Sequence, residues 1–202
     1  MRASYLVAAA ILMLPGVSLL GRKGGSSAPA ESRDPRFVAG NKLLRPEGYR
    51  EWIYLSSGLG MSYSKSSGAP QFTNVFVKPE AYRQFLKSGR WPEGTMFVLE
   101  ERDSSTRGSI NKAGRFQTKL RGLVAEVKDG SRFPEKWAFF SFTDPHGKLK
   151  DAATAFPKSA CWSCHHAHGA VDNTFVQFYP TLKEIAESKR TYRNEPPETE
   201  AR

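Results

Sequence analysis

The pentapeptide Cys161-Trp162-Ser163-Cys164-His165 constrains this chain more than any other segment. Its two cysteines are the only cysteines in 202 residues. Thiols at positions i and i+3 lie on one side of a helical turn, spaced for addition to the two vinyl groups of a haem, and the histidine that follows reaches the iron. The segment therefore predicts one covalent haem c per chain, attached through Cys161 and Cys164, with His165 as the iron ligand.

Two other chemistries use the same residue types and stay open at this point. One is a disulfide or a redox-active thiol pair, although residues 156–160 do not resemble the strand that precedes such a pair in a thioredoxin-like unit. The other is a zinc ion held by Cys161, Cys164, His166 and His168. Structural zinc sites usually join two ligand pairs from separated segments, and the sequence offers no second pair.

The N-terminus resembles a secretory signal, which agrees with haem attachment outside the cytoplasm. A positive start is followed by an almost wholly apolar run over residues 5–20, too short for a typical membrane span. We therefore expect a periplasmic protein, with an uncleaved N-terminal anchor as the alternative. The expected organisation is a signal peptide over 1–30, a linker over 31–41, a haem domain over 42–189 and a flexible tail over 190–202.

The chain carries a formal net charge of +10. Residues 1–30 hold three basic residues and no acidic one, so the excess falls to seven without them. The charges are scattered and no nucleic-acid-binding motif is present, so we expect no nucleic-acid partner. A solvated basic surface is one interpretation, and a docking face for an acidic redox partner or for membrane headgroups is the other.

The apolar pattern predicts strands first and helices last, an α+β arrangement. The strand 95–101 is apolar on both faces and is expected to be central. In the strand 116–128, we expect Glu126 and Lys128 to face solvent. Other expected elements are strands over 49–55, 71–77 and 137–142, a helix over 79–88, a loop over 104–108, a haem turn over 160–168, helical spacing over 171–179, and a last helix after Pro180 with a capping box at Thr181 and Glu184.

Several segments together resemble the cytochrome P460 family, which includes the cytochromes c′-beta. They follow one another in order over roughly residues 43–185 and are Leu44–Trp52 (LRPEGYREW), Val75–Tyr82 (VFVKPEAY), Gly94–Glu100 (GTMFVLE), Val127–Asp129, Trp137–Phe139, Cys161–His165 and Phe175–Pro180. The resemblance implies an antiparallel sheet packed with helices around one covalently attached c-type haem. It also implies a homodimer and a five-coordinate iron with His165 as the proximal ligand.

Within this family, the resemblance separates enzymes from gas-binding proteins at one position. The hydroxylamine-oxidising members bear a lysine that bonds to the porphyrin edge, and its position here holds Leu99. They also bear a distal carboxylate, whose position here holds Phe156. By the period of two in a strand, Phe97 faces the same way as Leu99. We therefore expect an apolar distal pocket that binds small diatomic gases such as NO or CO and lacks a base, as in the cytochrome c′-beta branch.

Two further functions stay open, so the sequence leaves open whether the protein is an enzyme. One is hydroxylamine or NO oxidation with a different cross-linking lysine, for which Lys78 and Lys119 are candidates. The other is electron transfer with a six-coordinate haem, for which Met61 and Met96 are the candidate ligands. Among side chains near the motif, His146 is a candidate sixth ligand, His166 and His168 are expected near the surface, and Trp162 is expected to pack on the porphyrin edge.

Overall fold

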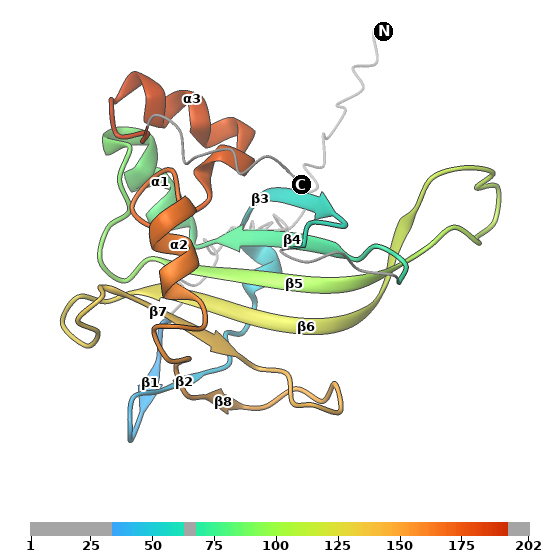
Figure 1. The fold of residues 1–202 in the computed structure, drawn as a ribbon, viewed down its shortest axis with the longest axis horizontal. Helices are drawn as coiled ribbons and strands as arrows, with labels where there is room; N and C mark the ends of the chain where they lie inside the picture. The colour runs from blue at the N-terminus through green and yellow to red at the C-terminus, as the bar shows by residue number, and fades with distance from the viewer. Residues whose placement is uncertain (1–33, 63–67, 194–202) are drawn as a thin grey trace, which may run out of the picture. The chain divides into compact units, whose positions relative to one another are not determined.

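The computed structural model describes residues 34–62 and 68–193, which belong to one compact unit. The predicted signal peptide and most of the predicted tail lie outside the described residues. This part of the chain contains two antiparallel sheets and three α-helices, so the expected α+β fold is confirmed (Figure 1). No helix in the described ranges is long and apolar enough to span a membrane.

The larger sheet has the strand order β3-β4-β5-β6-β7, and the smaller one has the order β1-β2-β8. All the pairings between these strands are antiparallel. The strands are β1 (Phe37–Val38), β2 (Lys42–Leu44), β3 (Ile53–Leu59), β4 (Phe72–Val77), β5 (Met96–Ser105), β6 (Phe116–Lys128), β7 (Trp137–Ser141) and β8 (Ala152–Ala153). The helices are α1 (Pro79–Ser88), α2 (Trp162–His168) and α3 (Pro180–Ser188), with short 3-10 turns at Tyr49–Glu51 and Val176–Phe178.

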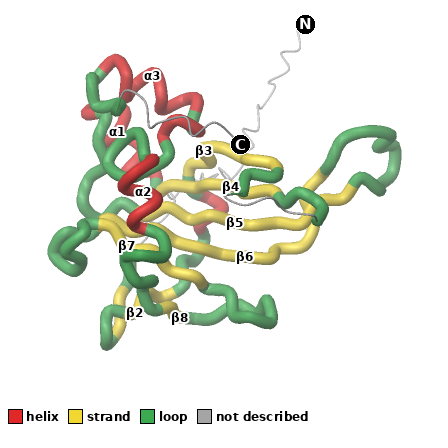
Figure 2. Tube along the Cα trace, viewed as in Figure 1, coloured by secondary structure: helices red, strands yellow, loops and turns green. Residues whose placement is uncertain are grey.

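The three helices lie on one face of the five-stranded sheet, which we call the helix face (Figures 1 and 2). This face carries Phe97 of β5 and Phe139 of β7, which pack with Phe85 of α1 and Leu182 of α3. The opposite face carries a second core, in which Met96 and Val98 of β5 pack with residues of the small sheet and of β6 and β7. The prediction that β5 is covered on both sides is therefore confirmed.

Helix α1 ends where the sequence predicts. Pro79 stands in its first turn, where the missing N–H costs nothing. Gly89 ends it in the left-handed conformation with φ 69°, and its N–H donates to the carbonyl of Phe85. The last helix also begins at Pro180, but Thr181 makes no side-chain cap, so the expected capping box with Glu184 is wrong.

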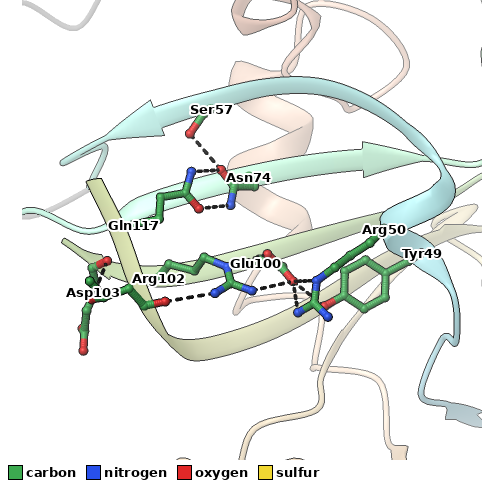
Figure 3. Close-up of polar contacts among 9 residues, drawn as sticks. Tyr49, Arg50, Ser57, Asn74, Glu100, Arg102, Asp103 and Gln117 are labelled. Carbon is green, nitrogen blue, oxygen red and sulfur yellow. Dashed lines mark hydrogen bonds and ion pairs between the residues drawn. The ribbon is translucent and has the colours of Figure 1, made fainter. Parts of the chain in front are cut away.

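The segment 49–55 is not one strand, which corrects the sequence-based expectation. Residues 49–51 form a 3-10 turn, and β3 starts at Ile53 and continues through Ser56–Gly58, where a stop was expected. The turn brings the Tyr49 hydroxyl and the Arg50 guanidinium onto the buried carboxylate of Glu100, at 2.5 and 2.8 Å (Figure 3). Satisfying a carboxylate that is 2% exposed outweighs the strand-forming preference of this segment.

Other differences are smaller. β5 runs four residues beyond its predicted end, so Ser104 and Ser105 belong to a strand rather than to the expected loop. The strand β1 lies inside the range predicted as linker, and it pairs with β2. Thr191, from the range predicted as tail, donates its hydroxyl to the carbonyl of Gly89.

Candidate functional site

Helix α2 carries the cysteine–histidine motif. Cys161 is its N-cap residue, and Cys164 and His165 lie within its seven residues. Both thiols are free and partly exposed, and Cys161 packs against the core of the helix face. Burial raises the pKa of the Cys161 thiol, and the nearby Glu126 and Cys164 raise it further. The motif therefore presents two unpaired thiols from one helical turn, with Cys161 against the core of the helix face.

The ring of His165 is held in a defined orientation. Its Nδ1 lies 3.1 Å from the main-chain carbonyl of Asn173. A carbonyl only accepts hydrogen bonds, so Nδ1 carries a proton, and in the neutral ring Nε2 keeps its lone pair. The rings of Phe139 and Phe175 pack on the imidazole, each at a centroid distance of 4.4 Å. This is the arrangement expected of a histidine that binds a metal through Nε2, with its other nitrogen held by the protein.

The carbonyl of Asn173 belongs to a two-residue hairpin turn over 171–174. Asp172 and Asn173 have φ angles of 52° and 64°, and Val171 and Thr174 exchange main-chain hydrogen bonds of 3.3 and 2.8 Å, as in a type I′ turn. The helical spacing expected over 171–179 is thus wrong for 171–174, because Asp and Asn accept the left-handed conformation that this turn requires. The indole N–H of Trp91 donates to the Thr174 hydroxyl at 2.8 Å, which ties the turn to the segment that precedes β5.

Glu126 is the functional residue that the sequence-based interpretation missed. It was expected to face solvent, but its side chain is 12% exposed and lies on the helix face, where β5 and β7 place Phe97 and Phe139 as its partners in register. Its Oε1 lies 3.5 Å from Nδ1 of His165. Burial lowers the pKa of His165, but the charge and proximity of Glu126 outweigh this, so the pKa is raised overall.

A signal for Glu126 existed in the sequence. The strands on both sides of β6 are apolar on both faces, so a strand between them must be covered on both faces as well. A charged residue in such a strand is shielded from water on either face, so it needs a partner within the protein.

Phe97 and Leu99 lie on the helix face, as expected from their spacing. Phe97 is buried and contacts the rings of Trp91 and Tyr179, with centroids 4.8 and 6.3 Å away. Leu99 is half-buried between Val75 and Val124, its partners in register on β4 and β6. The position that would hold a cross-linking lysine is therefore surrounded by aliphatic side chains.

The helix face is not wholly apolar beyond Leu99, however. Glu101 is the next residue of β5 on this face, and its side chain lies over Gly122, where an added Cβ would overlap its carboxylate. The sequence-based picture of an apolar face without a carboxylate is thus incomplete. Glu101 was missed because the space that it occupies depends on a glycine across the strand pair.

The other residues that the sequence suggests for the haem pocket or as iron ligands lie away from His165, Phe97 and Leu99. Phe156 is 43% exposed and its N–H donates to Phe139 at the outer edge of β7, so β6 and β7 separate it from Leu99. Met96 lies in the core of the opposite face, whereas Met61 is exposed and folds over Gly58.

The other histidines and lysines take varied positions. His146 stands in an exposed turn, and His166 is exposed, stacks on Trp162 and contacts the side-chain oxygen of Asn173. The Lys78 amine donates to the carbonyl of Asp34, and Lys119 is exposed on β6. Within residues 34–62 and 68–193, no three or more His, Cys, Asp or Glu side chains are close enough to hold a metal ion together, so the zinc set is not assembled.

The residues present do fit a haem. The thiols come from one helical turn, Nε2 of His165 is free to donate, and aromatic and aliphatic side chains form the facing surface of the sheet. The class that this fold and site define is a haem protein. A model of the family described as cytochrome P460 matches residues 46–176, and the chain belongs to this family. A comparison with curated proteins gives no match.

Proposed function

We propose that this protein is a mono-haem c-type cytochrome that binds small diatomic gases such as NO or CO. The observation that carries the proposal is the position of Leu99. It lies on the helix face between two valines, so the position of the cross-linking lysine offers no nucleophile. When bound, the haem supplies an iron with one open coordination position. An uncharged diatomic ligand needs no base to enter such a position and is selected by steric access.

Each group of the chain has a defined part in this function. Cys161 and Cys164 hold the porphyrin by thioether bonds, so its position does not depend on iron ligation alone. His165 would donate to the iron through Nε2, with Nδ1 turned toward the Asn173 carbonyl and Glu126. Phe97, which is buried on the helix face, and Leu99, between Val75 and Val124, would restrict the space for the gas.

Location and partners form part of the same proposal. The apolar run near the N-terminus supports export to the periplasm, where c-type haem is attached. The net positive charge supports an acidic redox partner protein. Homodimerisation rests on the family.

Glu101 favours a second candidate function, oxidation of hydroxylamine or NO. Its carboxylate lies on the helix face one position beyond Leu99, and a carboxylate is the kind of group that takes a proton from a bound substrate. A lysine other than residue 99 would have to form the cross-link in this case. The Lys78 amine is engaged by Asp34, and Lys119 is exposed on β6, which is why we place this function second.

The test is the optical spectrum of the mature protein, produced together with the c-type haem maturation machinery. A high-spin ferrous c-haem spectrum that shifts on adding CO or NO supports the gas-binding function. A strongly red-shifted ferrous Soret band, with a haem peptide that includes a lysine-bearing fragment, contradicts it and favours the oxidase. The variant with both Cys161→Ser and Cys164→Ser is the control, because it should lose haem on acid–acetone extraction while the native protein keeps it.

A further inference from the structure

The side chain of Glu126 is largely buried, with 12% of it exposed. Glu126 is the third residue from the end of β6, and both of its partners in register are phenylalanines. Its Oε1 is fully buried and has no hydrogen-bond partner among the described residues. A buried carboxylate oxygen without a hydrogen bond destabilises a fold, and an apolar residue would avoid this cost. The position therefore calls for an explanation other than packing.

Within residues 34–62 and 68–193, no lysine or arginine forms an ion pair with this carboxylate, and His165 is the basic side chain beside it. Lys128 is the next residue of β6 on the same face, but its amine is bonded to Asp172 and to the carbonyl of Trp91. The charge of Glu126 also raises the pKa of the Cys161 thiol in the same motif. The group that Glu126 approaches at 3.5 Å is Nδ1 of His165.

The hydrogen on Nδ1 thus has two acceptors within reach. The Asn173 carbonyl oxygen lies 3.1 Å from Nδ1 and is a neutral acceptor. The Oε1 atom of Glu126 lies 3.5 Å from Nδ1 and is a carboxylate oxygen. A small rotation of the ring moves the hydrogen toward the carboxylate. Bonding to a charged acceptor is stronger than bonding to a neutral one, and it makes the imidazole a better electron donor through Nε2.

We propose that Glu126 is a positioning residue that, through Nδ1 of His165, sets how strongly this histidine donates to the haem iron. This inference rests on the proposed function insofar as His165 must be the iron ligand. Stronger donation stabilises ferric over ferrous iron, so Glu126 lowers the reduction potential of the protein. It also strengthens the bond between iron and His165.

The experiment uses the haem-loaded protein and the variant Glu126→Gln, which keeps the shape and removes the charge. We expect the ferrous-to-ferric ratio at a fixed solution potential to rise about tenfold, which is about 59 mV for one electron. We also expect the iron–histidine stretching frequency of the ferrous protein, measured by resonance Raman spectroscopy, to fall. An unchanged frequency overturns the proposal, because a purely electrostatic or structural role would not require it to move.

Two further variants separate contact from charge. Glu135→Gln removes one negative charge near the same segment, where Glu135 pairs with Lys158 at 3.4 Å and not with His165, so it should leave both readouts near native values. Glu126→Asp keeps the charge but draws the carboxylate away from Nδ1. It should follow the glutamine variant in stretching frequency, and native behaviour of Glu126→Asp contradicts the proposal.

Failure of this inference is distinguishable from failure of the proposed function. If native protein shows no iron–histidine stretch and its spectrum is that of a cross-linked or six-coordinate haem, the proposed function fails. If native protein shows the stretch and binds CO, and Glu126→Gln changes neither frequency nor potential, only the role of Glu126 fails.

Discussion

Lys128 on β6 forms an ion pair with Asp172, which stands at the second position of the turn 171–174. The two side chains are 12% and 24% exposed, and the same amine also donates to the carbonyl of Trp91. One amine therefore connects the sheet, the segment before β5 and the turn whose carbonyl orients His165. The ion pair is part of the support of the site, although neither residue touches the histidine.

Replacing this lysine should weaken both the fold and the site. Lys128→Met leaves Asp172 without its cation in a largely buried place, and we expect a loss of about 1–3 kcal/mol in the free energy of unfolding. Urea unfolding followed by circular dichroism measures this loss. Arg83→Met is the control, since it breaks an exposed pair with Glu80 and should cost less than about 1 kcal/mol. Equal losses in the two variants would contradict the support assigned to Lys128.

Gly169 lies where α2 ends against the turn. A Cβ at this position would lie 2.6 Å from the carbonyl oxygen of His165 and from the carbonyl carbon of Asn173. Both are main-chain atoms and cannot rotate away, so Gly169→Ala should cost about 1–3 kcal/mol and disturb the orientation of His165. Thermal unfolding and the ferrous spectrum report the two effects. Gly130→Ala is the matched control, because nothing lies closer than 3.7 Å to its added Cβ, and it should be tolerated.

Glu100 should make the protein sensitive to acid. Burial raises the pKa of this carboxyl, but hydrogen bonds from Arg102, Tyr49 and Arg50 outweigh it and lower the pKa from 4.5 to about 2. A depressed folded-state pKa contributes stability above pH 4.5, and this contribution is lost as the pH falls toward 2. The loss amounts to at most about 3 kcal/mol.

The variant Glu100→Gln checks this dependence. It should be less stable than native protein near pH 6, but it should lose less stability between pH 6 and pH 3, as measured by urea midpoints at the two values. Glu184→Gln, on the exposed side of α3, should keep the native slope. A native slope in Glu100→Gln would remove Glu100 as its source.

Phe97 should control entry of a gas ligand. Phe97→Leu opens space on the helix face and should speed CO association with the reduced protein, at a cost of about 1–2 kcal/mol in stability. Val98→Ala removes buried volume from the neighbouring residue on the opposite face, so it should cost about 2 kcal/mol and leave the CO rate unchanged. Flash photolysis of the CO complex gives the rates. If Val98→Ala sped association as much as Phe97→Leu, the assignment of faces would be wrong.

Much of the fold was predictable because its signals are local. The bounds of β6 and α1 follow from alternation and from Pro79 and Gly89, which act within one or two residues. The segment 49–51 was not predictable in this way. Its conformation is set by the carboxylate of Glu100, a residue distant in sequence. The local sequence pattern does not indicate that partner.

The site residues also differ in whether local sequence predicts them. Cys161, Cys164 and His165 form a contiguous motif, so the sequence alone proposes them. The environment of His165 comes from Glu126 on β6 and from the main chain of Asn173, which meet only after the sheet and α2 have packed. Glu126 was misplaced because alternation describes which face a residue occupies, but not whether that face is covered.

The group that orients His165 is a main-chain carbonyl, at a residue with φ 64°. The side chain of Asn173 does not make this bond, but a residue that resists the left-handed conformation at this position would shift the carbonyl that does. The orientation of His165 therefore depends on the course of the backbone through 171–174. The orientation of the imidazole is set by the main chain of the turn. The residues that maintain it are therefore those whose side chains hold the turn in place.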